Sequence, residues 1–252
     1  MLNYQTYGPD TLPPLLITHG LFGSGRNWGA LAKKFSDIRH VVTVDMRNHG
    51  RSFRSAEHTY DALAQDLAEV IETFGGTADV IGHSMGGKSV MTLALRQPDM
   101  VRRLVVADIA PVSYAHDQLR YIDAMRAVDM SAVSRRSDAQ QQLAALGVEP
   151  KLTAFFTQSL DVASQSWLYN LDALADQMPE IMSFPTHDLL AFQNPTLFLT
   201  GALSDYVTHA HRPQIKSLFP QARFARLNGA GHWLHAEKPQ AFEDVVRAFL
   251  EA

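Results

Sequence analysis

The sequence predicts an α/β protein in which helices cover a doubly wound, mostly parallel sheet. Short apolar runs recur along the chain as expected strands, at Leu15–Thr18, Val41–Val44, Ala78–Ile81, Leu104–Ala107, Thr196–Leu199 and Ala222–Leu227. Strands that are apolar throughout are buried on both faces, as they are in parallel sheets. The segments between them show helical patterns, and strands that alternate with helices are typical of a doubly wound fold.

The spacing of apolar residues and the positions of prolines predict three helices. Residues 60–74 place Leu63, Leu67 and Val70 on one face, as an amphipathic helix requires. Residues 84–97 follow the third expected strand and end before Pro98. Residues 238–250 close the chain, with a proline in the first turn, a position that proline favours.

The alternation stops from about Ser113 to about Phe192. Residues 140–146 and 167–174 favour helix, and no convincing strand lies between them. A long, mostly helical insertion is more typical of a lid than of a loop. We therefore predict a core domain of residues 1–112 and 193–252, and a helical cap of residues 113–192 inserted between two strands. The alternative is a packing subdomain without a gating role.

Composition excludes several classes of function. The chain has 252 residues, enough for one core with a lid, and a net charge of −4 with no basic stripe, so nucleic acid is not an expected partner. Cysteine is absent, which excludes disulfides and thiolate metal sites. The N-terminus lacks a basic and apolar leader, and no apolar run approaches the roughly 20 residues of a membrane span. We expect a soluble, cytoplasmic protein.

The strongest chemical motif is Gly82-His83-Ser84-Met85-Gly86. It follows an expected strand and begins an expected helix, which is the setting of a nucleophile elbow. A serine forced into such a turn exposes its hydroxyl, and the glycines two residues before and after it avoid collisions. The helix N-terminus adds partial positive charge near a developing oxyanion. Ser84 is therefore the predicted nucleophile.

A glycine-rich turn, His19-Gly20-Leu21-Phe22-Gly23, follows the first expected buried strand. Such a turn lets a backbone N–H point at a substrate carbonyl. The N–H groups of Leu21 and Met85 are the natural pair for an oxyanion hole. Alone, the pattern would describe an ordinary strand–helix turn.

A general base is expected late in the chain, and His232 fits because it lies between Gly231 and the last helix. Two aspartates preserve the chain order Ser, Asp, His that accompanies a nucleophile elbow. Asp108 ends the fourth expected strand, and Asp205 follows the fifth strand and a turn. Spacing alone favours Asp205, because the turn places it beside the final loop.

Longer motifs carry a family resemblance. His19-Gly20, Asp45-Met46-Arg47-Asn48-His49-Gly50-Arg51-Ser52, His83-Ser84-Met85-Gly86-Gly87-Lys88, Asp108-Ile109-Ala110-Pro111-Val112 and the stretch from Gly231 to Pro239 resemble the α/β-hydrolase superfamily, and within it the YbfF-type esterases and their abhydrolase-domain relatives. The resemblance implies a seven-stranded sheet, a helical cap, and activity on short- to medium-chain esters and acyl-CoA thioesters. It also implies that the acid is the aspartate matching Asp108, although this chain has an aspartate at 205 as well.

The sequence leaves the roles of two features open. The residues from Asp45 to Ser52 could fix their loop by hydrogen bonds, which we favour, or touch a substrate. Lys88 lies one helical turn after Ser84, and we expect it to be solvated rather than to contact an anionic substrate group.

These residues predict a serine hydrolase that needs no organic cofactor and no metal; His209 and His211 are expected on a surface helix, not at a metal. The expected partner is a small acyl ester or acyl-CoA, and the sequence does not indicate an oligomeric state. The alternatives are carbon–carbon bond hydrolysis or cofactor-free perhydrolysis on the same triad, and a ligand-binding receptor. Relatives with dehalogenase or epoxide-hydrolase activity have a carboxylate where Ser84 stands.

Overall fold

The computed structural model describes residues 1–10, 13–37, 39–116, 118–185, 187 and 189–252. One sheet of seven strands organises the chain, in the order β1-β3-β2-β4-β5-β8-β9. The strands are β1 Tyr4–Tyr7, β2 Leu15–Thr18, β3 Val41–Val44, β4 Ala78–His83, β5 Val101–Ala107, β8 Thr196–Gly201 and β9 Ala222–Leu227. All neighbours pair in parallel except β1, which is antiparallel to β3. The predicted mostly parallel, doubly wound sheet is confirmed.

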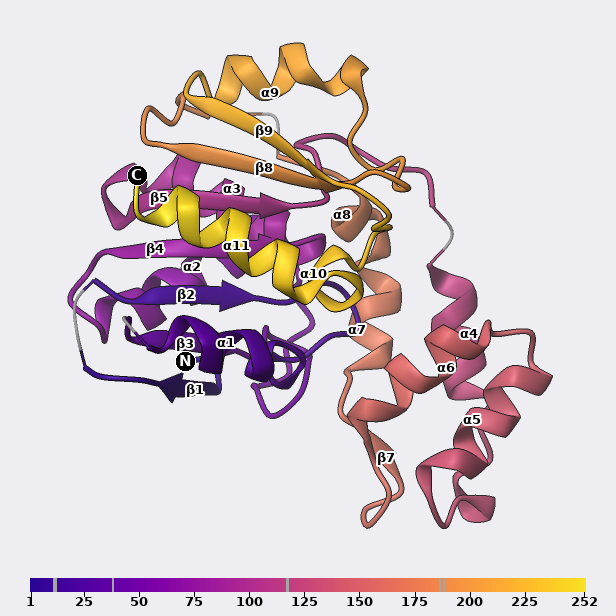
Figure 1. The fold of residues 1–252 in the computed structure, drawn as a ribbon. Coiled ribbons are helices and arrows are strands. Elements are labelled where there is room, and N and C mark those ends of the chain that lie inside the picture. The colour runs from indigo at the N-terminus through magenta and orange to yellow at the C-terminus, as the bar shows by residue number, and fades with distance from the viewer. Residues whose placement is uncertain (11–12, 38, 117, 186, 188) are drawn as a thin grey trace.

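Helices cover both faces of this sheet (Figure 1). On one face lie α1 Gly29–Phe35 and α11 Pro239–Leu250, the latter preceded by the short α10 Leu234–Glu237; on the other lie α2 Tyr60–Glu72, α3 Met85–Arg96 and α9 Arg212–Leu218. Alternate strand residues point to opposite faces, so Leu15 and Ile17 pack with α1 and α11 while Leu16 packs with α2 and α3. Burial on both faces explains why these strands are apolar throughout.

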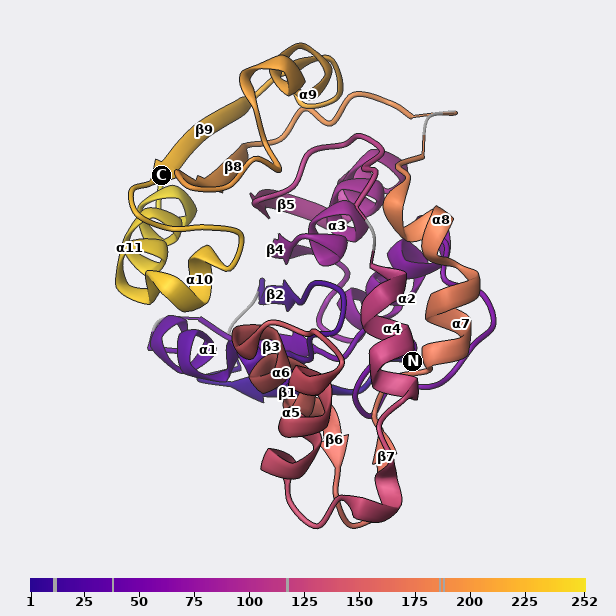
Figure 2. The same cartoon turned by 90° about the vertical axis from the view of Figure 1, so that its right-hand side faces the viewer.

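A cap lies between β5 and β8 in the chain, and both views place it beyond the carboxyl ends of the central strands (Figures 1 and 2). It consists of α4 Leu119–Arg126, α5 Arg136–Ala145, α6 Pro150–Phe156, β6 Leu160–Asp161, β7 Ser166–Trp167, α7 Leu171–Asp176 and α8 Met178–Met182. The short antiparallel pair β6–β7 was not expected, because two-residue strands leave no alternating pattern. Residues 117, 186 and 188 of the predicted cap lie outside the described residues.

The strand order reverses beside β2, since β3 pairs on one side of it and β4 on the other. Ligands of open α/β sheets bind at the carboxyl edge near such a switch point. The turns after β2 and β4, which carry the predicted oxyanion groups and Ser84, therefore meet there. Among the described residues, no helix is long and apolar enough to cross a membrane.

Candidate active site

Ser84 occupies a sharp turn between β4 and α3. Its backbone has φ +53° and ψ −120°, which a residue with a side chain adopts only at a cost in strain. Its N–H donates to the carbonyl oxygen of Ala107 at 3.1 Å and holds the turn in place. A Cβ on Gly82 would collide with the carbonyl of Gly86, and a Cβ on Gly86 with that of His19. Both glycines are therefore required for the turn that presents Ser84.

His232 lies in the loop between β9 and α10, and its Nδ1 is 2.8 Å from Oδ2 of Asp108. Asp108 is fully buried directly after β5. Its carboxylate also accepts the N–H of Gly201 at 2.9 Å and the hydroxyl of Ser204. Because a carboxylate only accepts hydrogen bonds, the His232 proton in this contact sits on Nδ1, and Nε2 remains available.

Asp205, the other candidate acid, is exposed and has no hydrogen bond or ion pair with any described residue. The turn after β8 does reach the buried carboxylate, but through Ser204 instead. The geometry thus pairs His232 with Asp108. The sequence analysis did not predict a role for Ser204. The only indication in the sequence is that Ser204 lies in the same turn as Asp205, directly before it.

Ser84 and His232 line one cavity of about 460 Å³. That volume falls in the range of small-molecule sites, about 300–1,000 Å³. The cap supplies an apolar part of the wall, with Leu152, Phe155, Phe156, Ile181 and Met182. Three other aromatic residues of residues 113–192, Trp167, Tyr169 and Phe184, are buried in the core and do not line the cavity.

The sequence predicts the N–H groups of Leu21 and Met85 as the donors of an oxyanion hole. Among the described residues, neither the Leu21 N–H nor the Met85 N–H donates to an acceptor, and both residues line the cavity. By contrast, the N–H of Phe22 donates to Nε2 of His49 at 3.2 Å, and that of Gly23 closes the turn onto the carbonyl of Gly20 at 3.0 Å. Both N–H groups that the sequence named for the oxyanion hole are thus unpaired among the described residues.

Aromatic rings pack around His232. The Tyr206 ring stacks on its imidazole with centroids 3.9 Å apart and planes 16° apart. His83 Nε2 lies 2.8 Å from the backbone oxygen of His232. Burial, with the nearby His235 and His232, holds the pKa of His83 well below its usual value, so His83 is a neutral donor that fixes this loop.

The expectation of a solvated Lys88 is wrong. Only 2% of the residue is exposed, and its Nζ donates to the carbonyls of Met182 at 3.0 Å and Ser183 at 2.5 Å. The rings of Tyr60 and Tyr114 lie 5.5 and 4.9 Å from it. Burial lowers the pKa of Lys88 to about 7. The cap covers this end of α3, which no local pattern in the sequence reveals.

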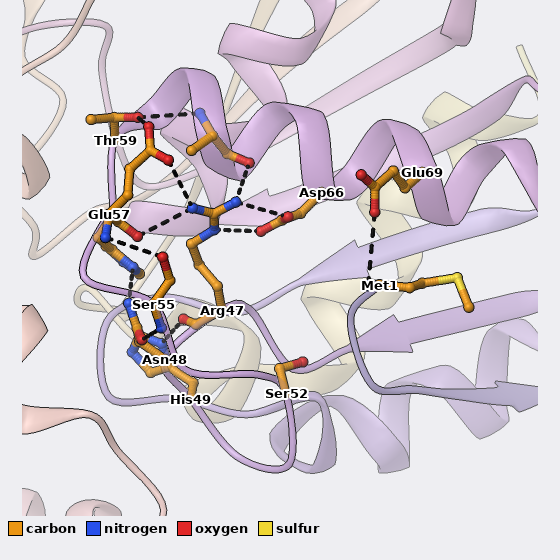
Figure 3. Close-up of polar contacts among 12 residues, drawn as sticks. Met1, Arg47, Asn48, His49, Ser52, Ser55, Glu57, Thr59, Asp66 and Glu69 are labelled. Atoms are coloured by element: carbon orange, nitrogen blue, oxygen red, sulfur yellow. Dashed lines mark hydrogen bonds and ion pairs between the residues drawn. The ribbon is translucent and has the colours of Figure 1, made fainter.

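The loop of residues 45–52 (the 45–52 loop) is tied down by its own polar contacts (Figure 3). Arg47 makes a two-pronged pair with Asp66, with Nε at 2.6 Å and Nη2 at 2.9 Å from the carboxylate oxygens. Asp45 accepts the N–H groups of Gly25 and Arg51 at 2.8 and 3.0 Å. No residue of this loop lines the cavity, which confirms the structural interpretation of the motif.

The residues that the structure describes contain no group of three or more His, Cys, Asp or Glu side chains that could hold a metal ion. The site therefore offers a hydroxyl, an imidazole, a buried carboxylate and two free amide N–H groups. Together these can support nucleophilic acyl transfer.

Comparison with known proteins places the chain among its relatives. Residues 13–239 match the family described as the alpha/beta hydrolase fold. The chain belongs to this family. It is 42% identical to the mouse protein named sn-1-specific diacylglycerol lipase ABHD11, over 96% of this chain and 82% of that protein. It is 39% identical to Esterase YbfF of Escherichia coli strain K12, over 94% and 92% of the two chains.

A solved structure titled "Marine microorganism esterase" superposes on this α/β hydrolase with a TM-score of 0.93, at 36% identity and with 98% of each chain covered. The predicted membership and its closeness to the YbfF-type esterases are confirmed. The chain is an α/β hydrolase of the type to which these esterases and lipases belong.

Proposed function

We propose that this α/β hydrolase cleaves carboxylic esters or thioesters through an acyl-enzyme. Ser84 is the nucleophile, His232 the general base and Asp108 the acid of the triad. The observation that carries the proposal is the 2.8 Å hydrogen bond from His232 to the buried Asp108, at the edge of the cavity that Ser84 lines. Hydrogen bonds of a triad are often long before substrate binds, and here the Ser84 hydroxyl has no partner among the described residues.

The mechanism follows from the roles of these groups. His232 Nε2 takes the proton of Ser84 as its oxygen attacks the substrate carbonyl. The N–H groups of Leu21 and Met85 stabilise the oxyanion. The leaving alcohol or thiol departs with the proton from His232, and water then repeats the steps on the acyl-enzyme. Asp108 holds the imidazole in the Nδ1–H form and stabilises the imidazolium. These steps need no metal or organic cofactor.

The substrate is a small acyl ester or an acyl-CoA thioester. The apolar cap residues in the cavity wall, such as Phe155 and Phe156, favour an aliphatic acyl group. The names of the relatives, an esterase and a diacylglycerol lipase, support an ester of this kind. We further propose that residues 113–192 form the lid of this site, because α6 and α8 contribute part of its wall.

Activity of the Ser84→Ala variant tests the proposal. We expect the wild-type protein to hydrolyse p-nitrophenyl esters or acyl-CoAs of two to ten carbons, and Ser84→Ala to lose this activity. A fluorophosphonate probe should label the wild type covalently and leave the variant unlabelled. Retained hydrolysis in Ser84→Ala would show that another group is the nucleophile. An unlabelled, inactive wild type would favour the ligand-binding receptor.

A further inference from the structure

The turn that carries Leu21 contains a strained residue. Phe22 has φ +61°, at the third position of a turn closed by the Gly23 N–H on the Gly20 carbonyl. Glycine or asparagine usually occupies a position with positive φ, because a large side chain collides with its own backbone there. Something outside the turn must hold Phe22 in this conformation.

One side of Phe22 is held by the 45–52 loop. His49, which is labelled in Figure 3, is buried and accepts the N–H of Phe22 on Nε2 at 3.2 Å. Its Nδ1 lies 2.9 Å from the carbonyl oxygen of Arg47, so Nδ1 carries the proton and Nε2 is the acceptor. Burial, with His19 and His58 nearby, keeps the pKa of His49 well below its usual value. His49 is therefore neutral and remains an acceptor.

The other side of Phe22 is held by the cap. The hydroxyl of Tyr169 donates to the carbonyl oxygen of Phe22 at 2.6 Å. Tyr169 lies between β7 and α7, is 2% exposed and does not line the cavity. Its backbone forms an antiparallel bridge with His49. The two groups that hold Phe22 are thus joined to each other.

The same loop fixes the peptide that carries the Leu21 N–H. In a trans peptide the N–H points opposite to the preceding C=O, so the Gly20 carbonyl determines where the Leu21 N–H points. That carbonyl lies 2.8 Å from Nδ1 of His19. Nε2 of His19 in turn accepts the N–H of Met46, in the 45–52 loop, at 3.0 Å. Both ends of the turn are therefore anchored on this loop.

We infer that His49 and Tyr169 are positioning residues of the oxyanion hole: they hold Phe22 in its strained conformation so that the Leu21 N–H faces the cavity. This inference rests on the proposed function, in which Leu21 stabilises the oxyanion. It makes the oxyanion hole depend on the docked cap, because one of the two contacts comes from Tyr169.

The test is Tyr169→Phe, which removes one hydroxyl and keeps the ring. Removing a whole oxyanion donor costs about 10²–10³ in kcat, and we expect misaligning one to lower kcat about ten-fold with KM within about two-fold. An aliphatic trifluoromethyl ketone, whose hemiketal oxygen occupies the oxyanion hole, should bind about ten-fold more weakly. Thr153→Val is the matched control, because it also removes one buried hydroxyl of the cap, which donates to the Pro150 carbonyl at 2.9 Å, and keeps the shape of the side chain.

His49 gives an independent second pair of variants. His49→Gln retains an acceptor and should keep most of kcat, whereas His49→Leu should lose at least as much as Tyr169→Phe. Wild-type kcat in Tyr169→Phe, an equal loss in Thr153→Val, or equal activity of the two His49 variants would overturn the inference. Failure of the proposed function would look different, since wild type itself would then escape fluorophosphonate labelling.

Discussion

Replacing Asp108 by asparagine should separate the two candidate acids. The side chain keeps its shape, and its oxygen still accepts the Gly201 N–H. The position of Oδ2, however, now carries an NH₂ group that faces His232 Nδ1 at 2.8 Å. Nδ1 must then become the acceptor, which moves the imidazole proton to Nε2. A histidine protonated there cannot take the proton of Ser84.

A tautomer exchange of this kind in a serine protease lowers kcat by about 10⁴, or about 5 kcal/mol in activation free energy. We expect a loss of this order in Asp108→Asn, measured as kcat for p-nitrophenyl butyrate. Asp205→Asn is the control, because the exposed Asp205 touches neither residue of the pair, and its kcat should stay within about two-fold of wild type. More than a tenth of wild-type kcat in Asp108→Asn, or a larger loss in Asp205→Asn, would refute the assignment.

Three further predictions concern the surroundings of the site. Ser204→Ala removes a donor to Asp108 and should lower kcat/KM about ten-fold, a typical effect of one charge-assisted hydrogen bond, while shifting its pH profile. Gly86→Ala puts a Cβ against the Thr18 hydroxyl and a backbone carbonyl and should cost about 3 kcal/mol or more of unfolding free energy in urea. Acid should destabilise the protein, because burial lowers the pKa of His58 and His235 to about 3. Below pH 6.5 these two histidines bind protons in the unfolded chain but stay neutral in the folded protein. The free energy of unfolding therefore falls as the pH is lowered from 6.5 toward 3. At pH 5 the two histidines together should lower the free energy of unfolding by about 4 kcal/mol. Urea unfolding at pH 7 and at pH 5 measures this difference.

Each of these has its own contrary result. An unchanged pH profile in Ser204→Ala would mean that the hydroxyl does not act on the triad. Wild-type stability in Gly86→Ala would show that the elbow can relax around a methyl group. Equal unfolding free energies at pH 7 and pH 5 would mean that the buried histidines accept protons in the folded state.

The sequence predicted the features that depend on neighbouring residues. Apolar runs identified the central strands because both faces of the sheet are covered, and the strand–turn–helix setting identified Ser84. Local spacing favoured Asp205 for the acid because the turn after β8 approaches the final loop, whereas the structure pairs His232 with Asp108. That turn does approach, but it brings Ser204 to a carboxylate from a different strand.

Contacts between the cap and the core could not be predicted from local sequence patterns. No pattern in the sequence around Lys88 indicates that this side chain is buried. It is buried because the chain at the end of α8 covers it, and the carbonyls of Met182 and Ser183 accept hydrogen bonds from its Nζ. Similarly, His49 is one of 11 histidines in the chain, and nothing near it in the sequence indicates that it accepts the N–H of Phe22. Such contacts join residues far apart in the chain, so only the assembled structure reveals them.

The proposed mechanism passes through an acyl group on Ser84. Mass spectrometry of wild-type protein, quenched in acid during the first turnovers of p-nitrophenyl acetate, tests this step most directly. We predict a mass increase of one acetyl group, located by fragmentation on Ser84 and absent from Ser84→Ala. An acetyl group on another residue, or active protein that never carries one, would contradict the proposed mechanism.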